Sequence, residues 1–161
     1  MRRLAEEIRR DYAGKNPLLI GILKGCFVFM ADLVRALDMP VEVDFVRISS
    51  YGLGKETSGK IKVLQPPSQP IKGRHVLVVE DIVDTGLTLS HFLNYLRQKR
   101  PASLKLCTFI DKRFRRQVPV PIDYVGIRIH SGFVVGYGTD FAEQYRYLSD
   151  VCVLEGGETR K

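Results

Sequence analysis

Apolar side chains recur along the chain with two periods, one typical of helices and the other of strands. Leu4, Ile8 and Tyr12 are spaced four residues apart and therefore share one face of a predicted helix. Short apolar runs between turn residues predict strands, because a strand buried on both faces reads as a continuous hydrophobic run. The predicted helices cover residues 3–12, 27–37 and 87–96, and the predicted strands cover residues 18–23, 41–48, 61–64, 75–79, 104–110, 124–129 and 151–154.

The order of these elements indicates the fold class. Strands alternate with helices through much of the chain, which predicts an α/β fold with an open, mainly parallel twisted sheet flanked by helices. No repeat, low-complexity tract or linker interrupts residues 1–161, so we expect a single domain. Ligands of such sheets bind beyond the carboxyl ends of the strands. Candidate chemistry is therefore expected just after Leu23, Val79 and Ile110.

Composition narrows the class of protein. A chain of 161 residues with 45% hydrophobic and 27% charged residues is typical of one globular domain. No segment approaches the roughly 20 apolar residues that span a bilayer, and residues 1–14 lack the apolar core of a signal peptide. We therefore expect a cytoplasmic protein that does not act at a membrane.

Cysteines and net charge exclude some partners and leave others open. Cys26, Cys107 and Cys152 are odd in number and form no Cys-x-x-Cys pair, which argues against a disulfide framework and a zinc site. We expect reduced and mostly buried thiols. The net charge of +7 suits nucleic-acid binding as well as phosphorylated substrates. Charge alone does not separate these two functions.

A cluster of carboxylates and hydroxyls follows the predicted strand 75–79. Glu80 and Asp81 offer hard oxygen atoms to Mg²⁺ or to sugar hydroxyls, and Asp84 is placed to accept a proton. The turn that follows enters a predicted helix, whose backbone N–H groups and dipole favour a phosphate. The phosphate-binding residues of this turn are Thr85, Gly86, Leu87 and Thr88.

An alternative interpretation assigns no chemistry to this motif. Asp84 and Thr85 would only cap the helix, and Glu80 and Asp81 would be solvated turn residues. Two acidic residues directly after the apolar run 76–79, in a basic chain, disfavour that interpretation.

The run VVEDIVDTGLTL resembles the ribose-diphosphate motif of the type I phosphoribosyltransferases. The resemblance implies that Glu80 and Asp81 hold the ribose hydroxyls and the magnesium, and that the Thr-Gly turn holds the 5-phosphate. It also implies a small hood formed by the N- and C-terminal segments. Leu87 is a departure, because some family members carry lysine there.

Other segments resemble the hypoxanthine-guanine phosphoribosyltransferases from about Leu4 to Leu154. Lys24 and Gly25 match the family's pyrophosphate loop, in which a nonproline cis peptide precedes the lysine. Arg146 matches an arginine that contacts pyrophosphate, for which its planar fork of donors is suited. The neighbouring arginines of residues 113–116 are interpreted as solvated charges.

The purine subsite is expected from three further segments. Lys112 matches the lysine that donates to the exocyclic oxygen of a 6-oxopurine, which discriminates against adenine. Phe133 would stack on the base, and the backbone of Val134 would pair with its edge. Asp140 would approach the second magnesium; Thr139 before it departs from the leucine common in relatives.

Ser50 and Tyr51 begin a polar, glycine-rich loop and resemble the family's lid, which would exclude water on closing. The N-terminal helix begins later than in relatives, so we expect further residues upstream. The resemblance implies a homodimer or homotetramer.

The resemblance implies that 5-phosphoribosyl 1-diphosphate and hypoxanthine, or guanine, give a nucleoside monophosphate and pyrophosphate with Mg²⁺ as cofactor. Asp84 would take the proton from the purine. Two alternatives stay open: RNA binding with a regulatory role, and xanthine or pyrimidine specificity on the same scaffold. Lys112 and Phe133 disfavour pyrimidines, and no contiguous basic, aromatic-interleaved stretch indicates RNA.

Overall fold

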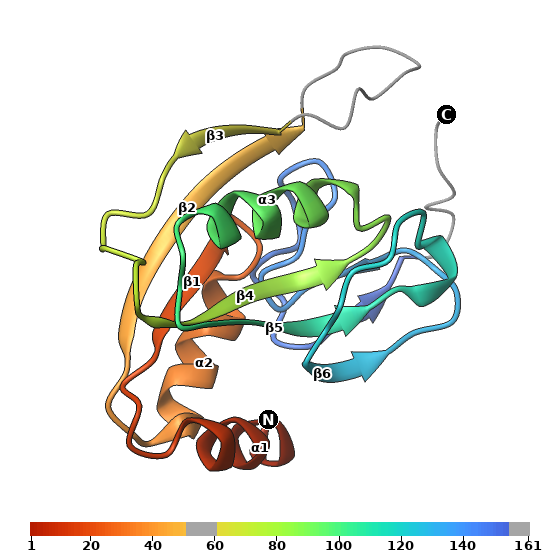
Figure 1. Ribbon diagram of the computed structural model, residues 1–161. Helices are drawn as coiled ribbons and strands as arrows, with labels where there is room; N and C mark the ends of the chain where they lie inside the picture. The colour runs from red at the N-terminus through yellow and green to blue at the C-terminus, as the bar shows by residue number, and fades with distance from the viewer. Residues whose placement is uncertain (51–60, 155–161) are drawn as a thin grey trace.

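A six-stranded sheet forms the centre of the molecule, with helices on both of its faces (Figure 1). The computed structural model describes residues 1–50 and 61–154. The strand order is β3-β2-β1-β4-β5-β6; only β3 is antiparallel to its neighbour. The elements are α1 (Arg2–Tyr12), β1 (Leu18–Leu23), α2 (Phe27–Leu37), β2 (Glu42–Ser50), β3 (Ile61–Gln65), β4 (His75–Val83), α3 (Leu87–Gln98), β5 (Ser103–Asp111), η1 (Arg113–Arg115), β6 (Tyr124–Arg128), β7 (Val134–Val135) and β8 (Cys152–Val153).

Both faces of the central strands are buried, which explains their continuous apolar runs. In β4, Val76 and Val78 pack in the cluster beneath α3, whereas Leu77 and Val79 pack against α1 and α2. Successive strand residues point to opposite faces, so a helical layer on each side must cover each set. The predicted open, mainly parallel α/β sheet is confirmed.

Strand β4 is longer than its apolar run predicted. It continues through Glu80, Asp81 and Ile82 to Val83, because β5 also extends and keeps pairing with it: Glu80 lies opposite Thr108, and Val83 opposite Asp111. The prediction that Glu80 and Asp81 follow the strand end is therefore wrong. Both residues are part of the strand, which restricts their backbone far more than a turn would.

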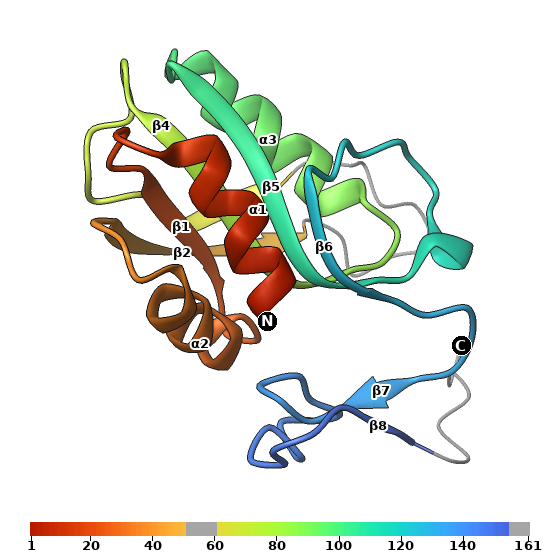
Figure 2. The same ribbon diagram turned by 90° about the horizontal axis from the view of Figure 1, so that it is seen from below.

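The C-terminal residues form a separate two-stranded antiparallel sheet, β7–β8, below the carboxyl end of the main sheet (Figure 2). The predicted hood was to include the N-terminal segment as well, and that part is wrong. Helix α1 instead packs on the main sheet beside α2, because Leu4, Ile8 and Tyr12 are buried in the cluster there.

The direction in which successive strands are added to the sheet changes between the parallel neighbours β1 and β4. From β1 the chain crosses through α2 to β2 on one side, and from β4 it crosses through α3 to β5 on the other. The two crossover loops diverge at this point and leave a crevice at the carboxyl ends of β1 and β4. The residues expected to carry chemistry after Leu23 and around Glu80 lie at this edge.

The prediction of mostly buried thiols is confirmed: Cys26 and Cys107 are buried, whereas Cys152 is exposed. All three thiols are free in the described part of the chain. Within residues 1–50 and 61–154, no helix combines the length and apolar character needed to cross a membrane.

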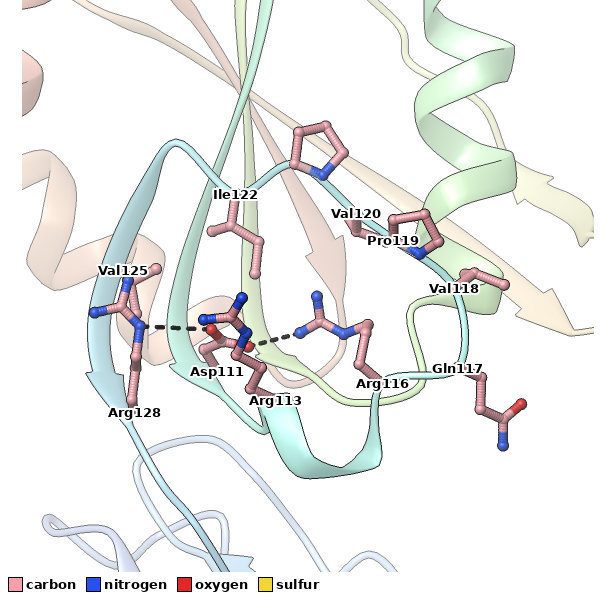
Figure 3. A pocket seen from close by; sticks show the side chains of 11 residues that line it. Asp111, Arg113, Arg116, Gln117, Val118, Pro119, Val120, Ile122, Val125 and Arg128 are labelled. Carbon is pink, nitrogen blue, oxygen red and sulfur yellow. Dashed lines mark hydrogen bonds and ion pairs between the residues drawn. The ribbon is translucent and has the colours of Figure 1, made fainter.

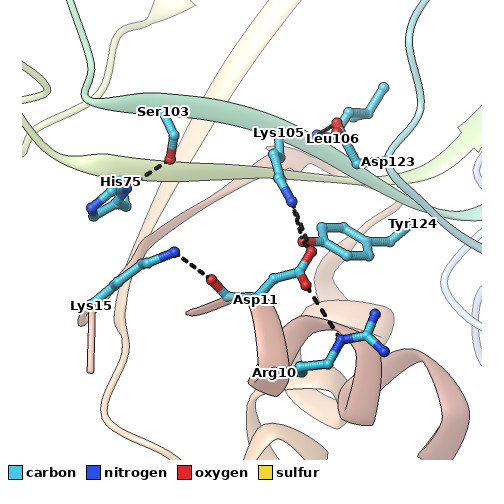
Figure 4. A network of polar contacts seen from close by, with 9 residues as sticks. All are labelled: Arg10, Asp11, Lys15, His75, Ser103, Lys105, Leu106, Asp123 and Tyr124. Atoms are coloured by element: carbon cyan, nitrogen blue, oxygen red, sulfur yellow. Dashed lines mark hydrogen bonds and ion pairs between the residues drawn. The ribbon is translucent and has the colours of Figure 1, made fainter. Parts of the chain in front are cut away.

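A polar network joins the end of α1 to the sheet (Figure 4). Lys105 Nζ donates to Asp11 Oδ2 at 2.8 Å and to the Tyr124 hydroxyl at 2.9 Å, and that hydroxyl donates to Asp11 Oδ2 at 2.7 Å. The hydrogen bonds from Lys105 and then Tyr124 lower the pKa of Asp11 to about 2. Ionised Asp11 is therefore favoured by the folded state.

This network predicts an acid-sensitive contribution to stability. The pKa of Asp11 is lower in the folded chain than its usual 3.8, so the contribution is present above about pH 4 and is lost as the pH falls toward 2. Asp11→Asn should lower the melting midpoint by a few degrees at pH 7, and this difference should shrink as the pH falls from about 4 toward 2. Glu6→Gln, on the exposed face of the same helix, is the control. An equal loss at every pH would contradict the role of the Asp11 charge.

Candidate functional site

The loop after β1 contacts the acidic end of β4 directly. The Leu23–Lys24 peptide is cis, as the resemblance implied. A Cβ built at Gly25 would overlap the carboxylate of Asp81, so only glycine lets the loop backbone approach this closely. Lys24, Gly25 and Asp81 are thereby brought together from two strands.

The carboxylate of Glu80 has an unusual environment. It lines a cavity of about 210 Å³ at the carboxyl end of β4, between Ile22 and the turn that leads into α3. Burial, and next the charge of the neighbouring Asp81, raise the pKa of Glu80 well above its usual range. The neutral form of Glu80 is therefore favoured unless a cation offsets the charge of the two carboxylates.

The turn before α3 is open toward the same cavity. Gly86 is the N-cap residue with φ +82°, and a Cβ there would meet Val120 and Arg116 within 2.9 Å. No side chain caps the helix, and Thr85 Oγ1 approaches the Leu87 N–H only at 3.5 Å. The interpretation that Asp84 and Thr85 serve only as helix caps is therefore not supported.

The predicted phosphate-binding residues are largely brought together. The cavity is lined by Ile22, Ile48, Glu80, Ile82, Val83, Asp84, Thr85, Gly86, Thr88 and Leu89. The side chain of Leu87 is not among these lining residues, so its expected contribution is limited to its backbone N–H. A small pocket edged by hydroxyls, N–H groups and carboxylates suits a phosphorylated sugar.

Arg115 and Arg116 hold the loop of Asp84, although both were predicted from the sequence to be solvated charges. Arg115 Nε lies 3.0 Å from Asp84 Oδ1. Arg116 Nε donates to the Asp84 carbonyl at 2.8 Å, and its Nη2 donates to the Val83 carbonyl at 3.2 Å and to Asp111 Oδ1 at 2.6 Å. The Arg116 side chain is only 14% exposed, so for this residue the prediction of a solvated charge is wrong.

A larger cavity of about 760 Å³ lies between β5, β6 and the loop of residues 116–122 (Figure 3). Arg116 and Arg128 pair there with the buried Asp111, at 2.6 Å and 3.7 Å. None of the predicted site residues lines it. We assign the chemistry to the smaller cavity, where the acidic and phosphate-binding groups meet.

Lys112 is a buried cation next to the aromatic group expected to stack on a base. Its Nζ lies 5.1 Å from the centroid of the Phe133 ring, and only 5% of the residue is exposed. Burial lowers the pKa of Lys112, while the nearby charge of Asp84 opposes that shift. The Lys112 N–H also donates to the Val83 carbonyl at 3.0 Å, which fixes the residue beside the loop of Asp84.

The part of the chain that contains β7 and β8, here called the C-terminal unit, carries the other expected residues and packs on the loop after β1. A Cβ at Gly138 would lie 2.5 Å from the Gly25 carbonyl oxygen, and the Tyr137 hydroxyl donates to Asp32 of α2 at 2.6 Å. Val134, in β7, pairs with Val153. Phe133 and Val134 therefore belong to a unit that α2 and the Lys24–Gly25 loop hold in place.

The ion pairs of this unit include Glu143, a residue that was not predicted from the sequence. Arg146 pairs with Asp140 at 2.7 Å and with Glu143 at 3.2 Å, and Glu143 also pairs with Lys24 at 2.9 Å. The hydrogen bonds from Lys24 and Arg146 lower the pKa of Glu143. Nothing in the local sequence singles out Glu143, because one of its two partners, Lys24, lies 119 residues earlier in the chain.

The lid cannot be placed in the same way. Ser50 ends β2, and Tyr51 lies outside the described residues. The lid assignment of Ser50 and Tyr51 stays a prediction.

Comparisons with known proteins agree on one family. A family profile described as "Phosphoribosyl transferase domain" matches residues 1–142. The chain is 47% identical over 154 residues to the hypoxanthine-guanine phosphoribosyltransferase of Streptococcus pneumoniae, covering 96% of this chain and 86% of that protein. It is 45% identical over 156 residues to the enzyme of the same name from Aquifex aeolicus, covering 96% and 88%.

Solved structures are similar over the same span. A hypoxanthine phosphoribosyltransferase from Staphylococcus aureus superposes with a TM-score of 0.92 at 37% identity, covering 96% of this chain and 84% of that one. A mutant of the Trypanosoma cruzi hypoxanthine phosphoribosyltransferase, solved as a ternary substrates complex, gives a TM-score of 0.91 at 44% identity and covers 96% and 88%.

Proposed function

Because the chain belongs to the hypoxanthine-guanine phosphoribosyltransferase family, we propose that its crevice between β1 and β4 binds 5-phosphoribosyl 1-diphosphate and a 6-oxopurine side by side. The enzyme transfers the 5-phosphoribosyl group to hypoxanthine or guanine in purine salvage, giving IMP or GMP and pyrophosphate. The observation that carries the residue assignments is the cavity in which Glu80, Asp84 and the turn Thr85–Thr88 meet.

The 5-phosphate and the diphosphate occupy two ends of this crevice. The turn of residues 85–88 offers hydroxyls and N–H groups at the start of α3, which favours a phosphate. Lys24 and Arg146 offer positive charge on the other side, next to the Gly25 backbone. The ribose between them would lie over Glu80 and Asp81, whose carboxylates accept hydrogen bonds from its hydroxyls.

The base lies between Lys112 and the C-terminal unit. Lys112 donates to the exocyclic oxygen, Phe133 stacks on the ring, and the Val134 backbone pairs with the edge of the base. Asp84 is close enough to Lys112 for their charges to interact. We assign to Asp84 the proton that leaves the purine ring as the new bond to ribose forms.

The donor set around Glu80 and Asp81 fits Mg²⁺. Glu80 and Asp81 are neighbouring carboxylates whose charges oppose each other, so a bound cation would offset that repulsion. Mg²⁺ is commonly held by one or two carboxylates, with water and substrate phosphates completing its shell, and among the described residues no group of three or more potential ligands gathers. Bound with the diphosphate, the ion would neutralise charge on the leaving group. Asp140 fits less directly, because it is paired with Arg146 at 2.7 Å.

Gly25→Ala tests the contact with Asp81. The added methyl group would overlap the end of a flexible carboxylate, so we expect Asp81 to turn away while the fold persists. The Mg²⁺ concentration for half-maximal activity should rise about tenfold, with a melting midpoint within a few degrees of wild type. An unchanged Mg²⁺ requirement, in a variant that folds, would contradict the assignment of Asp81.

The base specificity is tested with a panel of hypoxanthine, guanine, xanthine and adenine, each incubated with 5-phosphoribosyl 1-diphosphate and Mg²⁺ and followed by absorbance. We expect conversion of hypoxanthine and guanine and none of adenine. A salt-dependent shift of RNA mobility without nucleotide formation would favour the regulatory alternative instead. The dimer or tetramer, the lid and the cytoplasmic location stay predictions.

A further inference from the structure

Glu143 holds together the two cations that we assign to the diphosphate. Its Oε1 lies 2.9 Å from Lys24 Nζ, and its Oε2 lies 3.2 Å from Arg146 Nη2. Each oxygen therefore contacts a different cation. The Glu143 carboxylate thus contacts both cations through separate oxygens, as a bridging phosphate group would.

The backbone around Glu143 is shaped to present this side chain. The Glu143 N–H donates to Asp140 Oδ2 at 2.8 Å, and Phe141 and Gln144 exchange backbone hydrogen bonds across the turn. Ala142 and Glu143 both have positive φ values, 52° and 63°. Side-chain-bearing residues rarely adopt this region, and such backbone persists where surrounding contacts enforce it. The turn therefore places Glu143 between its partners rather than leaving it free in solvent.

An anion with more charge can readily replace the Glu143 carboxylate between Lys24 and Arg146. The side chains of Lys24 and Glu143 are 54% and 66% exposed, and exposed ion pairs contribute little because water and salt screen them. Pyrophosphate carries more negative charge than one carboxylate and offers several oxygens to each cation. Pyrophosphate would therefore displace Glu143, and the displaced carboxylate would stay close enough to repel the bound anion.

We propose that Glu143 is a built-in competitor for the diphosphate: it pairs with Lys24 and Arg146 when they are free and recaptures them as pyrophosphate leaves. The residue thereby weakens product binding and speeds release, a step that limits turnover in many enzymes. This inference rests on the proposed assignment of Lys24 and Arg146 to the diphosphate. Glu143 acts through those cations and is a positioning residue.

Glu143→Gln tests the competition with a side chain of the same shape and no charge. We expect pyrophosphate with Mg²⁺ to bind about three- to tenfold more tightly by calorimetry, the product-inhibition constant to fall by the same factor, and the KM for 5-phosphoribosyl 1-diphosphate to fall with it. The gain should shrink as salt is raised. Glu6→Gln makes the same change of net charge on exposed α1 and should leave pyrophosphate affinity unchanged.

Further variants separate this inference from the proposed function. Glu143→Asp keeps the charge but is one methylene shorter, so it should give a smaller gain than the glutamine variant. In a Lys24→Ala background, Glu143→Gln should give a reduced gain. One result would overturn only the competitor role of Glu143: Lys24→Ala weakens pyrophosphate binding, but Glu143→Gln leaves it unchanged or weaker than in the wild type. Pyrophosphate affinity that does not respond to Lys24→Ala would contradict the proposed subsite itself.

Discussion

Asp84→Asn is expected to reduce kcat for hypoxanthine by about 10²- to 10⁴-fold, the usual contribution of a positioned general base. Asparagine has the same shape and cannot accept the purine proton. The phosphate-binding turn keeps its backbone, because Arg116 bonds the Asp84 and Val83 carbonyls rather than the Asp84 side chain. The KM and calorimetric affinity for 5-phosphoribosyl 1-diphosphate should therefore stay within a few-fold of wild type.

A matched control is available at Asp38. This residue ends α2 with φ +43°, a conformation that asparagine tolerates well, so Asp38→Asn makes the same chemical change without strain and away from the proposed site. Its kcat should equal that of wild type. If Asp84→Asn also turned over normally, Asp84 would not be the base, whereas a parallel loss of sugar diphosphate binding would assign it to binding instead.

Lys112→Gln should lower kcat/KM for hypoxanthine by about 10- to 100-fold, since a hydrogen bond to a charged group commonly contributes about 1.5–3 kcal/mol. Glutamine can also present an oxygen to an exocyclic amino group, which should raise adenine use relative to hypoxanthine. Lys112 is buried between Phe133 and the loop of Asp84, so the lost donor is not replaced by bulk water. The ratio of initial rates with the two bases measures the effect.

Lys99→Gln is the control for this change. Lys99 lies at the end of α3, with its Nζ 4.6 Å from the centroid of the Tyr95 ring and remote from the purine subsite. The Lys99→Gln substitution removes the same charge and should leave the rates with hypoxanthine and with adenine unaltered. Unchanged use of hypoxanthine and adenine by the Lys112 variant would show that another group reads the exocyclic position.

Local pattern was enough to predict most elements of the fold. Helix α2 has the predicted bounds, because its apolar positions repeat with the helical period and turn residues flank them. The motif of residues 80–88 combines acidic, hydroxyl and glycine residues that are chemically unusual after an apolar run, so it predicted a candidate site without any tertiary information, and most of these residues do line one cavity. Lys24, Lys112 and Phe133 came from family resemblance, since each alone is an ordinary residue.

Contacts between distant segments were decided by tertiary structure alone. Strand β4 extends through Glu80 and Asp81 because β5 is long enough to keep pairing with it, which no property of the β4 sequence reports. From the sequence, Arg116 is predicted to be a solvated charge. In the folded chain its guanidinium donates to the carbonyls of Val83 and Asp84.

The same limit applies to the diphosphate subsite. Glu143 meets Lys24 across 119 residues only because the C-terminal unit docks on the loop after β1. Periodicity indicates which face of an element is buried, and therefore most of the elements, the α/β layering and the acidic motif could be predicted from the residues alone. The partner of an exposed charge depends on how two loops approach each other, so the bridge at Glu143 and the support of Asp84 by Arg116 required the folded chain.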